Sequence, residues 1–387
     1  MNLYIRVLEN MKKRRDRNIA GEYNCIPSPF PRFSNDFVGV EQGKYYLVTG
    51  VAKSAKTQFA SRVFVYEPVR QAYLHPDKIK LKCFYYPFEE SPEAVFLRYI
   101  SYLIYTESEG RIRLSSTDLK STKHDKPLSD EVLELLASDE YKEQLNFFES
   151  VVYFSEQTNP TGINKECRDW ALQNGELIRS NPITYEDPDG VEKTTSKVDH
   201  YEAKDPNLYT IIFIDHISLI STERGMNLRE SIIKLSSYLV RLRNFYNFTP
   251  VVIQQQSSDT ESIDSIKLGR TKPTIAGLAD SKYTARDCNM ALGVHSPYKY
   301  DEKEYLGYDI TRFRNNIRFV EVLVNRDGES NGVCPLYFDG VTCTFRELPL
   351  PKSSDIPKVY KYLDNLRGAP TLLFLHRIRN LFKAKHE

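Results

Sequence analysis

The sequence predicts an α/β protein with a mostly parallel central sheet, because apolar runs alternate with helical patterns from residue 43 to about 345. One run leads through a short loop directly into a helical pattern, and acidic or amide residues follow several others. Ligands of parallel sheets bind at the carboxyl ends of the strands, so these polar residues mark the expected site. The predicted strands are Tyr45–Thr49, Leu81–Tyr86, Val151–Phe154, Thr210–Ile214, Pro250–Gln255, Met290–Val294 and Phe319–Val324.

The composition is that of an ordinary globular protein. The chain has 387 residues, of which 41% are hydrophobic and 27% charged. This length suffices for one α/β domain of about 250–300 residues with appendages. The formal net charge is +1, so any basic surface must be local. Because no apolar run reaches 18 residues and no signal-peptide pattern is present, we expect no contact with a membrane.

The cysteines predict neither disulfides nor a metal site. They are scattered, without a C-x-x-C pair and without the Cys/His spacing of a zinc site. Free thiols in a reducing cytoplasm are therefore expected. The six residues are Cys25, Cys83, Cys167, Cys288, Cys334 and Cys343.

Residues 1–25 form a separate element before the predicted core. An apolar stripe (Leu3, Ile5, Leu8, Met11) precedes the basic run Lys12–Arg17. Such a pattern fits a solvated basic helix end and, equally, an arm that docks on a neighbouring subunit or touches phosphates. The proline-rich segment 26–31 cannot be helical and predicts an extended connector.

Residues 46–57 carry the most informative motif. The apolar run Tyr46–Thr49 ends at Gly50, Lys56 and Thr57 follow at the spacing of a phosphate-binding loop, and a helical pattern comes next. In such a loop backbone N–H groups hold phosphate oxygens, the lysine reaches the β- and γ-phosphates, and the threonine hydroxyl binds Mg²⁺. Ala55 stands where a second glycine belongs, so a lysine- and serine-rich turn is the alternative. The expected nucleotide-binding residues are Gly50, Val51, Ala52, Lys53, Ser54, Ala55, Lys56, Thr57 and Gln58.

Two other strand ends carry carboxylates that nucleotide hydrolysis requires. The run Thr210–Ile214 ends in Asp215, which we expect to hold Mg²⁺ together with Thr57. Hydrolysis also needs a base that orients the attacking water. Glu89 lies nearest the end of the strand Leu81–Tyr86 and is the preferred candidate, with Glu90 and Glu93 as alternatives.

The strand Pro250–Ile253 runs into three glutamines, which is unusual for a purely structural strand. An amide at this position can bond the γ-phosphate and report its loss to the following loop. That loop, residues 257–283, is long and polar, and loops of this length are usually functional. Its cations would bind nucleic acid without reading the sequence. They are Lys267, Arg270, Lys272 and Lys282.

Two segments look like appendages of the core. Residues 181–207 predict a polar hairpin around an Asp-Pro-Asp-Gly turn. Residues 351–387 form a tail whose late part is basic and amphipathic, with apolar Leu373, Phe374, Ile378 and Leu381. A helix packed on the domain surface is the simplest interpretation, and binding to a partner, lipid or DNA is the alternative.

The order of these motifs resembles the RecA-like ATPase domain of DnaB-type replicative helicases, over residues 26–346. Besides the phosphate-binding loop at residues 50–57 (the P-loop), several segments are similar to motifs of that family. They are residues 26–43 (the approach to the P-loop), 88–93 ("SLEMS-x-E"), 159–161, 215–219 ("DYLQL"), 250–256 ("PVVALSQ"), 278–289 ("LRES…DAD") and 325–328 ("K-Q-R-N-G").

The resemblance implies roles for individual residues. Glu89 would be the catalytic glutamate and Arg326 an arginine finger. Gln256 would sense the γ-phosphate, with Gln255 as the alternative. The residues expected to face DNA are Arg224, Lys267, Arg270, Lys272, Asp280 and Lys282.

The resemblance also implies a ring, most simply a homohexamer, that hydrolyses ATP with Mg²⁺ and translocates on single-stranded DNA. A primase or a helicase loader would be a partner. We expect the family's N-terminal helical domain to be missing, and the first twenty or so residues are similar in position to its linker helix. Compact helicases of this kind resemble phage-encoded members, which would act in the cytoplasm of a bacterial host.

Departures from the family keep rival functions open. Ala55 replaces the glycine of the P-loop, Val324 replaces a lysine two residues before the finger, and Ala279 replaces a DNA-contacting arginine. The rivals are a RecA-like recombinase and a regulatory or loader ATPase that does not unwind DNA. The expected domains are an arm (1–25), the ATPase domain (26–350) and the tail (351–387).

Overall fold

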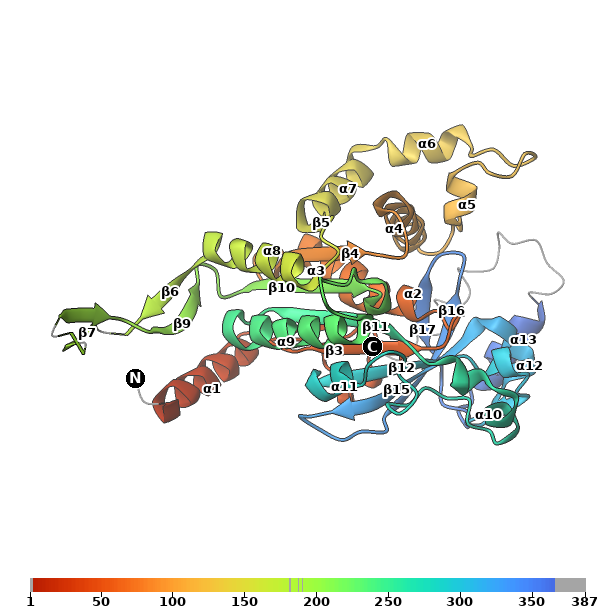
Figure 1. The fold of residues 1–387 in the computed structure, drawn as a ribbon. Coiled ribbons are helices and arrows are strands. Elements are labelled where there is room, and N and C mark those ends of the chain that lie inside the picture. Colours follow the sequence, from red (N-terminus) through yellow and green to blue (C-terminus); the bar gives the residue numbers. More distant parts are fainter. Residues whose placement is uncertain (1–2, 181, 187, 190, 366–387) are drawn as a thin grey trace.

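A computed structural model describes residues 3–180, 182–186, 188, 189 and 191–365. Its centre is a nine-stranded sheet of strand order β17-β16-β15-β12-β3-β11-β10-β4-β5 (Figure 1). The strands are β3 (Tyr46–Gly50), β4 (Lys80–Pro87), β5 (Val152–Phe154), β10 (Leu208–Asp215), β11 (Thr249–Gln255), β12 (Met290–His295), β15 (Ile317–Asn325), β16 (Val333–Asp339) and β17 (Thr344–Glu347). All seven predicted strands are confirmed, and β16 and β17 were not predicted.

The prediction of a mostly parallel sheet is also confirmed. Strands β5, β4, β10, β11, β3 and β12 run parallel, and β15, β16 and β17 continue the sheet as antiparallel strands. Parallel strands need crossover connections, which is why helices separate them along the chain. The carboxyl ends of β4, β10, β11 and β3 therefore meet at one edge of the sheet, where the P-loop begins.

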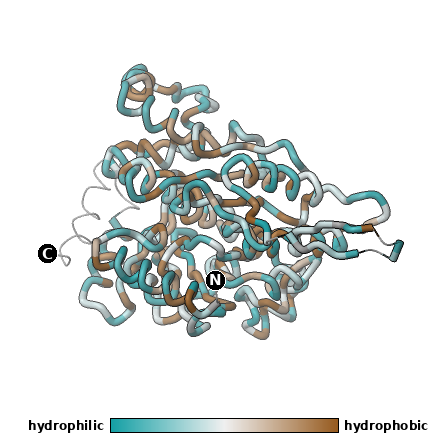
Figure 2. The backbone as a smooth tube through the Cα atoms, turned by 90° about the vertical axis from the view of Figure 1, so that its left-hand side faces the viewer, coloured by the Kyte–Doolittle hydropathy of each residue, from teal (hydrophilic) through white to brown (hydrophobic). Residues whose placement is uncertain are grey.

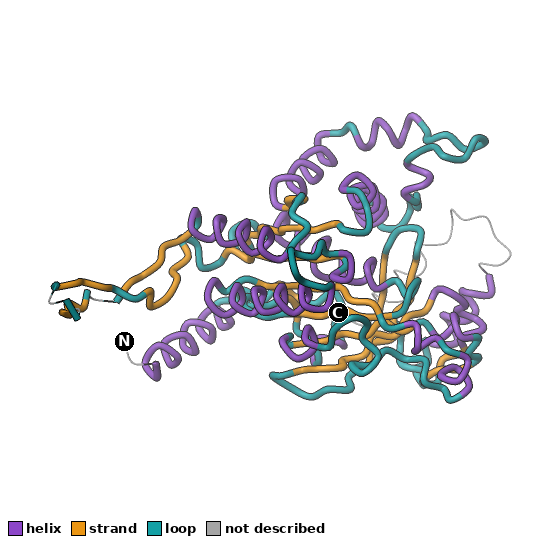
Figure 3. Tube along the Cα trace, viewed as in Figure 1, coloured by secondary structure: helices purple, strands orange, loops and turns teal. Residues whose placement is uncertain are grey.

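Helices cover both faces of the sheet, as buried parallel strands require (Figures 1 and 3). The helices packed on the face that carries the P-loop helix are α2 (Lys56–Ser61), α3 (Glu67–Leu74), α4 (Pro92–Glu107) and α7 (Asp139–Val151), with a π-helical turn (Arg62–Tyr66) between α2 and α3. The opposite face carries α8 (Pro160–Gln173) and α9 (Leu228–Tyr246). Strands β3, β4, β10, β11 and β12 thus send alternate side chains into two hydrophobic cores, and Ile317 and Phe319 of β15 belong to a third, smaller one.

Helix α9 shows how the local sequence fixes an element. Asn227 and Glu230 form a capping box at its N-terminus, in which each side chain accepts the other residue's backbone N–H. The apolar stripe that the sequence predicted, including Leu235 and Leu239, is fully buried against the sheet. Asn247 ends the helix in a left-handed conformation.

The N-terminal arm is a helix, α1 (Leu3–Ile19), whose apolar side chains from Tyr4 onward are largely exposed. Chain segment 26–40 follows as a short antiparallel pair, β1 (Ile26–Pro27) with β2 (Gly39–Val40).

The predicted insertion projects from the body of the molecule (Figures 1 and 2). It consists of two consecutive antiparallel pairs: β6 (Gly175–Arg179) with β9 (Val198–Ala203), and β7 (Ile183–Glu186) with β8 (Glu192–Thr195). Its first strand begins six residues before the predicted start at 181 (181 − 175 = 6). Two residues of the predicted turn, Asp187 and Gly190, lie outside the described residues.

Shorter elements complete the fold. They are α5 (Ser116–Leu119), α6 (Asp130–Leu136), α10 (Ile263–Lys267), α11 (Tyr283–Asp287), α12 (Ile310–Phe313), α13 (Ile356–Asn365) and the pair β13 (Glu304–Tyr305) with β14 (Tyr308–Asp309). The predicted apolar stripe at 373–381 lies outside the described residues. No helix of the described ranges has the length and hydrophobicity that a membrane span needs. All six cysteines are free thiols, as predicted.

Candidate functional site

The loop between β3 and α2 has the backbone conformation of an anion-binding turn. Lys53 and Ala55 adopt left-handed conformations, with φ angles of 63° and 70°. Left-handed residues alternating with ordinary ones turn successive N–H groups toward one point, which creates a cavity for an anion. Ala55 therefore takes a conformation that usually requires glycine, at a cost of about 1–2 kcal/mol.

Three other residues hold this loop in place. Gly50 must be a glycine, because a Cβ atom there would lie 2.8 Å from the carbonyl oxygen of Val294. Lys299 donates a hydrogen bond to the carbonyl oxygen of Ala52 (2.9 Å). Arg318 donates one to the carbonyl oxygen of Ser54 (2.8 Å). The loop is thus fixed through its carbonyls, and the Ser54 N–H closes a turn on the carbonyl oxygen of Val51 (3.3 Å).

The residues predicted to bind phosphate and Mg²⁺ lie together at this loop. Lys56 opens α2 and is buried, and the Thr57 hydroxyl donates a hydrogen bond to Asp215 Oδ1 (3.1 Å). Burial raises the pKa of Asp215 to about 7, against the opposing effect of the Thr57 hydrogen bond. Burial also lowers the pKa of Lys56, while the charges of Glu89 and Asp215 favour its ammonium form. A cation that binds between Thr57 and Asp215 would replace the proton on this carboxylate.

Of the three candidate bases, the geometry favours Glu89. The N–H groups of Phe88 and Glu89 both bond the carbonyl oxygen of Asp215 (2.8 and 3.3 Å), which ties the end of β4 to the end of β10. By contrast, Glu90 is ion-paired with Arg98, and Glu93 lies exposed in the first turn of α4.

The Glu89 carboxylate is half-exposed, and its nearest basic partner is His216, with 3.9 Å between Oε2 and Nε2. Burial lowers the pKa of His216, so the imidazole is neutral at neutral pH. The Glu89 carboxylate therefore has no tight ion pair among the described residues, which suits a general base.

The three glutamines after β11 differ in what their side chains contact. Gln256 is buried, and its amide bonds the Thr49 hydroxyl (2.9 Å) on β3 and both the C=O (3.1 Å) and the N–H (3.2 Å) of Thr274. Gln254 bonds the carbonyls of Ala279 and Ser281. These two amides join the P-loop strand and its neighbour to loop 257–283.

Gln255 lies on the other face of the sheet. Its register partner on β3 is Gly50, and strand alternation puts it on the same face as Asp215. The position of Gln255 thus fits contact with a phosphate better than that of Gln256, whose amide is already occupied. The choice of Gln256 as sensor remains a prediction from the resemblance.

The residues predicted to face DNA divide into separate groups. Loop 257–283 is not structureless, because it contains a 3-10 turn (Ser258–Glu261) and α10. Its first part packs on segment 297–302, through ion pairing of Glu261 with Lys299 and a hydrogen bond from Thr271 to Glu302 (2.7 Å). Lys267 and Arg270 are exposed in this part.

The remaining predicted DNA contacts lie elsewhere on the surface. Lys272 is ion-paired with Glu321 of β15 (3.4 Å). Asp280 and Lys282 are exposed beside the segment that Gln254 holds, and Arg224 is exposed in the loop before α9.

Arg326 lies at the opposite end of the sheet from the P-loop. It follows Asn325, which pairs with Met290 at the start of β12, and Met290 in turn pairs with Tyr46 at the start of β3. The P-loop begins at the other end of β3, four residues away, or about 13 Å. Arg326 is exposed and donates a hydrogen bond to the carbonyl oxygen of Arg286.

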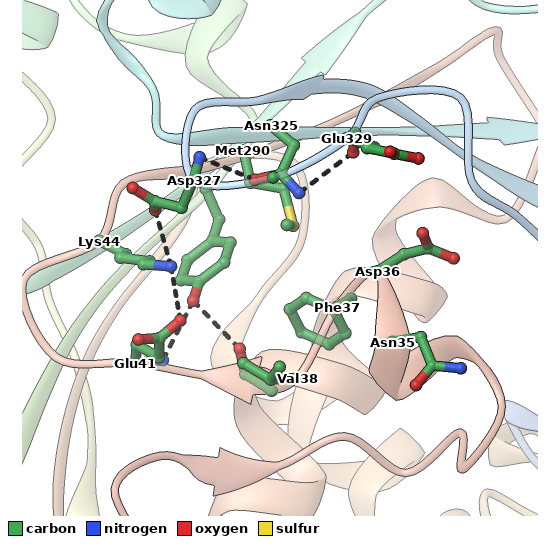
Figure 4. A pocket seen from close by; sticks show the side chains of 13 residues that line it. Asn35, Asp36, Phe37, Val38, Glu41, Lys44, Met290, Asn325, Asp327 and Glu329 are labelled. Atoms are coloured by element: carbon green, nitrogen blue, oxygen red, sulfur yellow. Dashed lines mark hydrogen bonds and ion pairs between the residues drawn. The ribbon is translucent and has the colours of Figure 1, made fainter. Parts of the chain in front are cut away.

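The residues on either side of this arginine, Asn325 and Asp327, line a pocket of about 380 Å³ (Figure 4). Asp327 and Glu329 from the segment after β15 line it, together with Asp36 and Glu41 from the segment before β3. Lys44 bridges Glu41 (2.5 Å) and Asp327 (2.8 Å) across it.

Comparison with solved structures identifies the fold. A solved structure of the ATPase domain of a DnaB-like helicase matches with a TM-score of 0.58 and 14% identity, over 90% of this chain and 100% of that chain. "The Structure Of A DnaB-Like Replicative Helicase And Its Interactions With Primase" matches with a TM-score of 0.60 and 14% identity, over 90% of this chain and 68% of that chain. The chain has the fold of a DnaB-like helicase ATPase domain. No model of a known protein family and no curated protein matches it.

Within this DnaB-like fold, the donors at the P-loop fit Mg²⁺ rather than a transition metal. Thr57 and Asp215 offer one hydroxyl and one carboxylate, and Mg²⁺ completes its shell with phosphate oxygens and waters. In the described ranges no group of three or more His, Cys, Asp or Glu side chains could hold a metal ion by itself.

Sequence reasoning missed Arg318, Lys299 and Gln254. Arg318 had a local signal, since it is a charged residue beside the apolar run Phe319–Val324. Lys299 had none, because a lysine after a buried strand is common. Gln254 was predicted only as one of three amides after the strand. Its contacts could not be predicted, because the face of the sheet on which each amide lies depends on the register of β11.

Proposed function

We propose that this protein is an ATP-dependent DNA helicase that works as a ring, with nucleotide bound between neighbouring subunits. The main support for the proposal is that the expected catalytic residues lie at two opposite ends of the parallel strands. Lys56, Thr57, Asp215 and Glu89 lie at the carboxyl end of the parallel strands, whereas Arg326 lies exposed at their amino end. An arginine there can reach the nucleotide of another subunit only, as repeated head-to-tail packing in a ring would allow.

In this proposal each residue has a defined task. Backbone N–H groups of residues 51–57 and the Lys56 ammonium bind the phosphates of ATP. Thr57 and Asp215 hold Mg²⁺, which supplies positive charge to the phosphate oxygens when it is bound. Glu89 orients and deprotonates the attacking water. The neighbouring subunit's arginine, equivalent to Arg326, stabilises the charge of the transition state, a role worth about 10³–10⁵ in rate in related chemistry.

Movement on DNA would follow from the amide contacts behind the P-loop. Gln256 joins Thr49, next to the P-loop, to Thr274 in loop 257–283. Loss of the γ-phosphate would shift this strand end, and the amide would pass the shift to the loop. Exposed cations of the loop, including Lys267 and Arg270, would hold the backbone of single-stranded DNA.

The proposed partners follow from the same assignment. They are single-stranded DNA, further copies of this chain in a homohexameric ring, and a primase or helicase loader. One of the matched structures describes a helicase with primase, which supports a search for such a partner. A cytoplasmic location, in a bacterial host if the chain is phage-encoded, belongs to the same proposal.

The direct test is ATP-dependent unwinding of forked DNA, combined with negative-stain imaging of particle symmetry. Lys56→Ala and Arg326→Ala should each abolish unwinding and DNA-stimulated ATP hydrolysis while far-UV circular dichroism stays unchanged. Exposed Lys142 of α7 and Arg229 of α9 supply matched controls, and their alanine variants should unwind normally. Strand exchange without unwinding would indicate a recombinase, and nucleotide binding without hydrolysis would indicate a loader.

A further inference from the structure

Arg318 is a fully buried cation directly behind the P-loop. It lies on β15, next to β12, and its side chain is among the largest that the described structure buries, at 1% exposed. Nε donates to the carbonyl oxygen of Ser54 (2.8 Å). The two terminal nitrogens donate to the carbonyls of Asn315 (2.8 Å) and Ile317 (2.7 Å) and to Asn315 Oδ1 (2.9 Å). The guanidinium also stacks on the ring of Phe338, 4.6 Å from its centroid.

All of these partners are neutral. Among the described residues no carboxylate lies within ion-pair distance of Arg318, whereas Arg62, an arginine that is largely buried near α3, is paired with Glu67. A buried charge without a counter-charge is costly, because carbonyl dipoles replace only part of its hydration. Burial alone lowers the pKa of Arg318 to about 10, still well above neutral pH.

The proposed phosphate site is close enough to supply the counter-charge that Arg318 lacks. Ser54, which accepts the Nε–H bond, belongs to the loop whose N–H groups face the proposed phosphate site on its other side. We propose that Arg318 is a positioning residue of the nucleotide site, which holds the Ser54 carbonyl and whose charge is balanced by the polyphosphate of the bound nucleotide. This inference rests on the proposed nucleotide binding.

Two roles of Arg318 must be separated, and they make different predictions. As a structural tie it would matter only through its hydrogen bonds, so any donor of similar length would replace it. As a positive charge it would attract the negative polyphosphate across the protein interior, where charges interact more strongly than in water. In that case only another cation could replace it. Arg318→Gln keeps one donor for the Ser54 carbonyl and removes the charge. Arg318→Lys keeps one donor and the charge as long as the lysine is protonated.

The experiment measures MgATP affinity by calorimetry for the wild type and both variants at pH 6, 7, 8 and 9. Arg318→Gln should weaken MgATP binding on the order of tenfold at every pH. Arg318→Lys should bind almost as the wild type at pH 6 and approach the glutamine variant by pH 9, because a buried lysine loses its proton in this range. Arg113→Gln is the control, since that half-buried arginine is paired with Asp339 rather than with the P-loop.

Three outcomes would overturn the assignment. They are wild-type affinity in Arg318→Gln, equal loss in both variants at all pH values, and a lysine variant that already binds MgATP at pH 6 as weakly as at pH 9. A lysine variant with wild-type affinity at every pH would have kept its charge and would support the assignment. If Arg318→Lys fails to fold, the affinity of Arg318→Gln still tests the assignment. If Arg318→Gln fails to fold, the pH profile of Arg318→Lys does. If the wild type binds no MgATP, or Lys56→Ala binds it normally, the proposed function itself fails; if these behave as proposed and Arg318→Gln binds normally, only the role of Arg318 fails.

Discussion

The buried carboxylate of Asp215 should make the stability of the metal-free protein depend on pH. Its folded-state pKa is about 7, raised by burial, and its ordinary value is 3.8. A carboxyl group with a raised pKa stabilises the fold fully below its unfolded pKa, and this stabilisation is lost as pH rises through the folded pKa. From these two values, the free energy of unfolding should fall by about 2.5 kcal/mol between pH 5 and pH 8 because of Asp215 alone.

Asp215→Asn isolates this contribution. The amide has nearly the same shape, still accepts the Thr57 hydrogen bond, and does not titrate. Urea unfolding of both proteins in EDTA at pH 5, 6, 7 and 8 gives the difference in unfolding free energy, in which all other titrating groups cancel. We expect the wild type to lose about 2.5 kcal/mol relative to the variant across this range.

Adding Mg²⁺ and ADP at pH 8 should restore stability to the wild type by binding the ionised carboxylate, and should help Asp215→Asn much less. Parallel pH profiles for the two proteins, within about 0.5 kcal/mol, would refute the assigned burial and pKa of Asp215.

Three further predictions concern the P-loop, its link to loop 257–283 and the core. Ala55→Gly should stabilise the protein by about 0.5–1 kcal/mol in urea unfolding, because glycine removes the left-handed strain but has more freedom when unfolded; a destabilised variant would contradict this. Gln256→Leu should lower DNA stimulation of ATP turnover on the order of tenfold while basal turnover changes little, and an equal loss of both would count against coupling through this amide. Leu239→Ala, at a fully buried position of α9, should cost about 2–5 kcal/mol in unfolding free energy with an unchanged KM; a cost under about 1 kcal/mol would show that the site is not packed as described.

The sheet was largely predictable because its parallel strands are buried on both faces. Such strands are continuous apolar runs in the sequence, whatever their order in the sheet. For this reason β3, β4, β10, β11 and β12 could be predicted. Strands β16 and β17 were missed for physical reasons. Val333–Asp339 alternates buried and partly buried residues around Pro335, and Thr344–Glu347 is too short to show a period.

The site was predictable where it is local in sequence. Lys56, Thr57 and Asp215 each follow a strand end, and the shared edge of the parallel sheet brings them together. Contacts between distant residues could not be predicted. Arg318 and Lys299 reach the P-loop from 264 and 247 residues away. Strand alternation puts Gln255 and Gln256 on opposite faces, but which of them faces the P-loop helix depends on strand register, which no local pattern fixes.

In the proposed ring, one subunit's P-loop works with its neighbour's Arg326. Mixing two inactive variants shows whether the two sites cooperate across the subunit interface. Lys56→Ala retains the arginine and Arg326→Ala retains the P-loop, so random 1:1 mixing restores about a quarter of the interfaces in a ring. We expect DNA-stimulated ATP hydrolysis near a quarter of the wild-type rate in the mixture and none in either variant alone. Hydrolysis that stays absent at every mixing ratio, although mixed particles form, would show that Arg326 does not act on the neighbouring subunit's nucleotide.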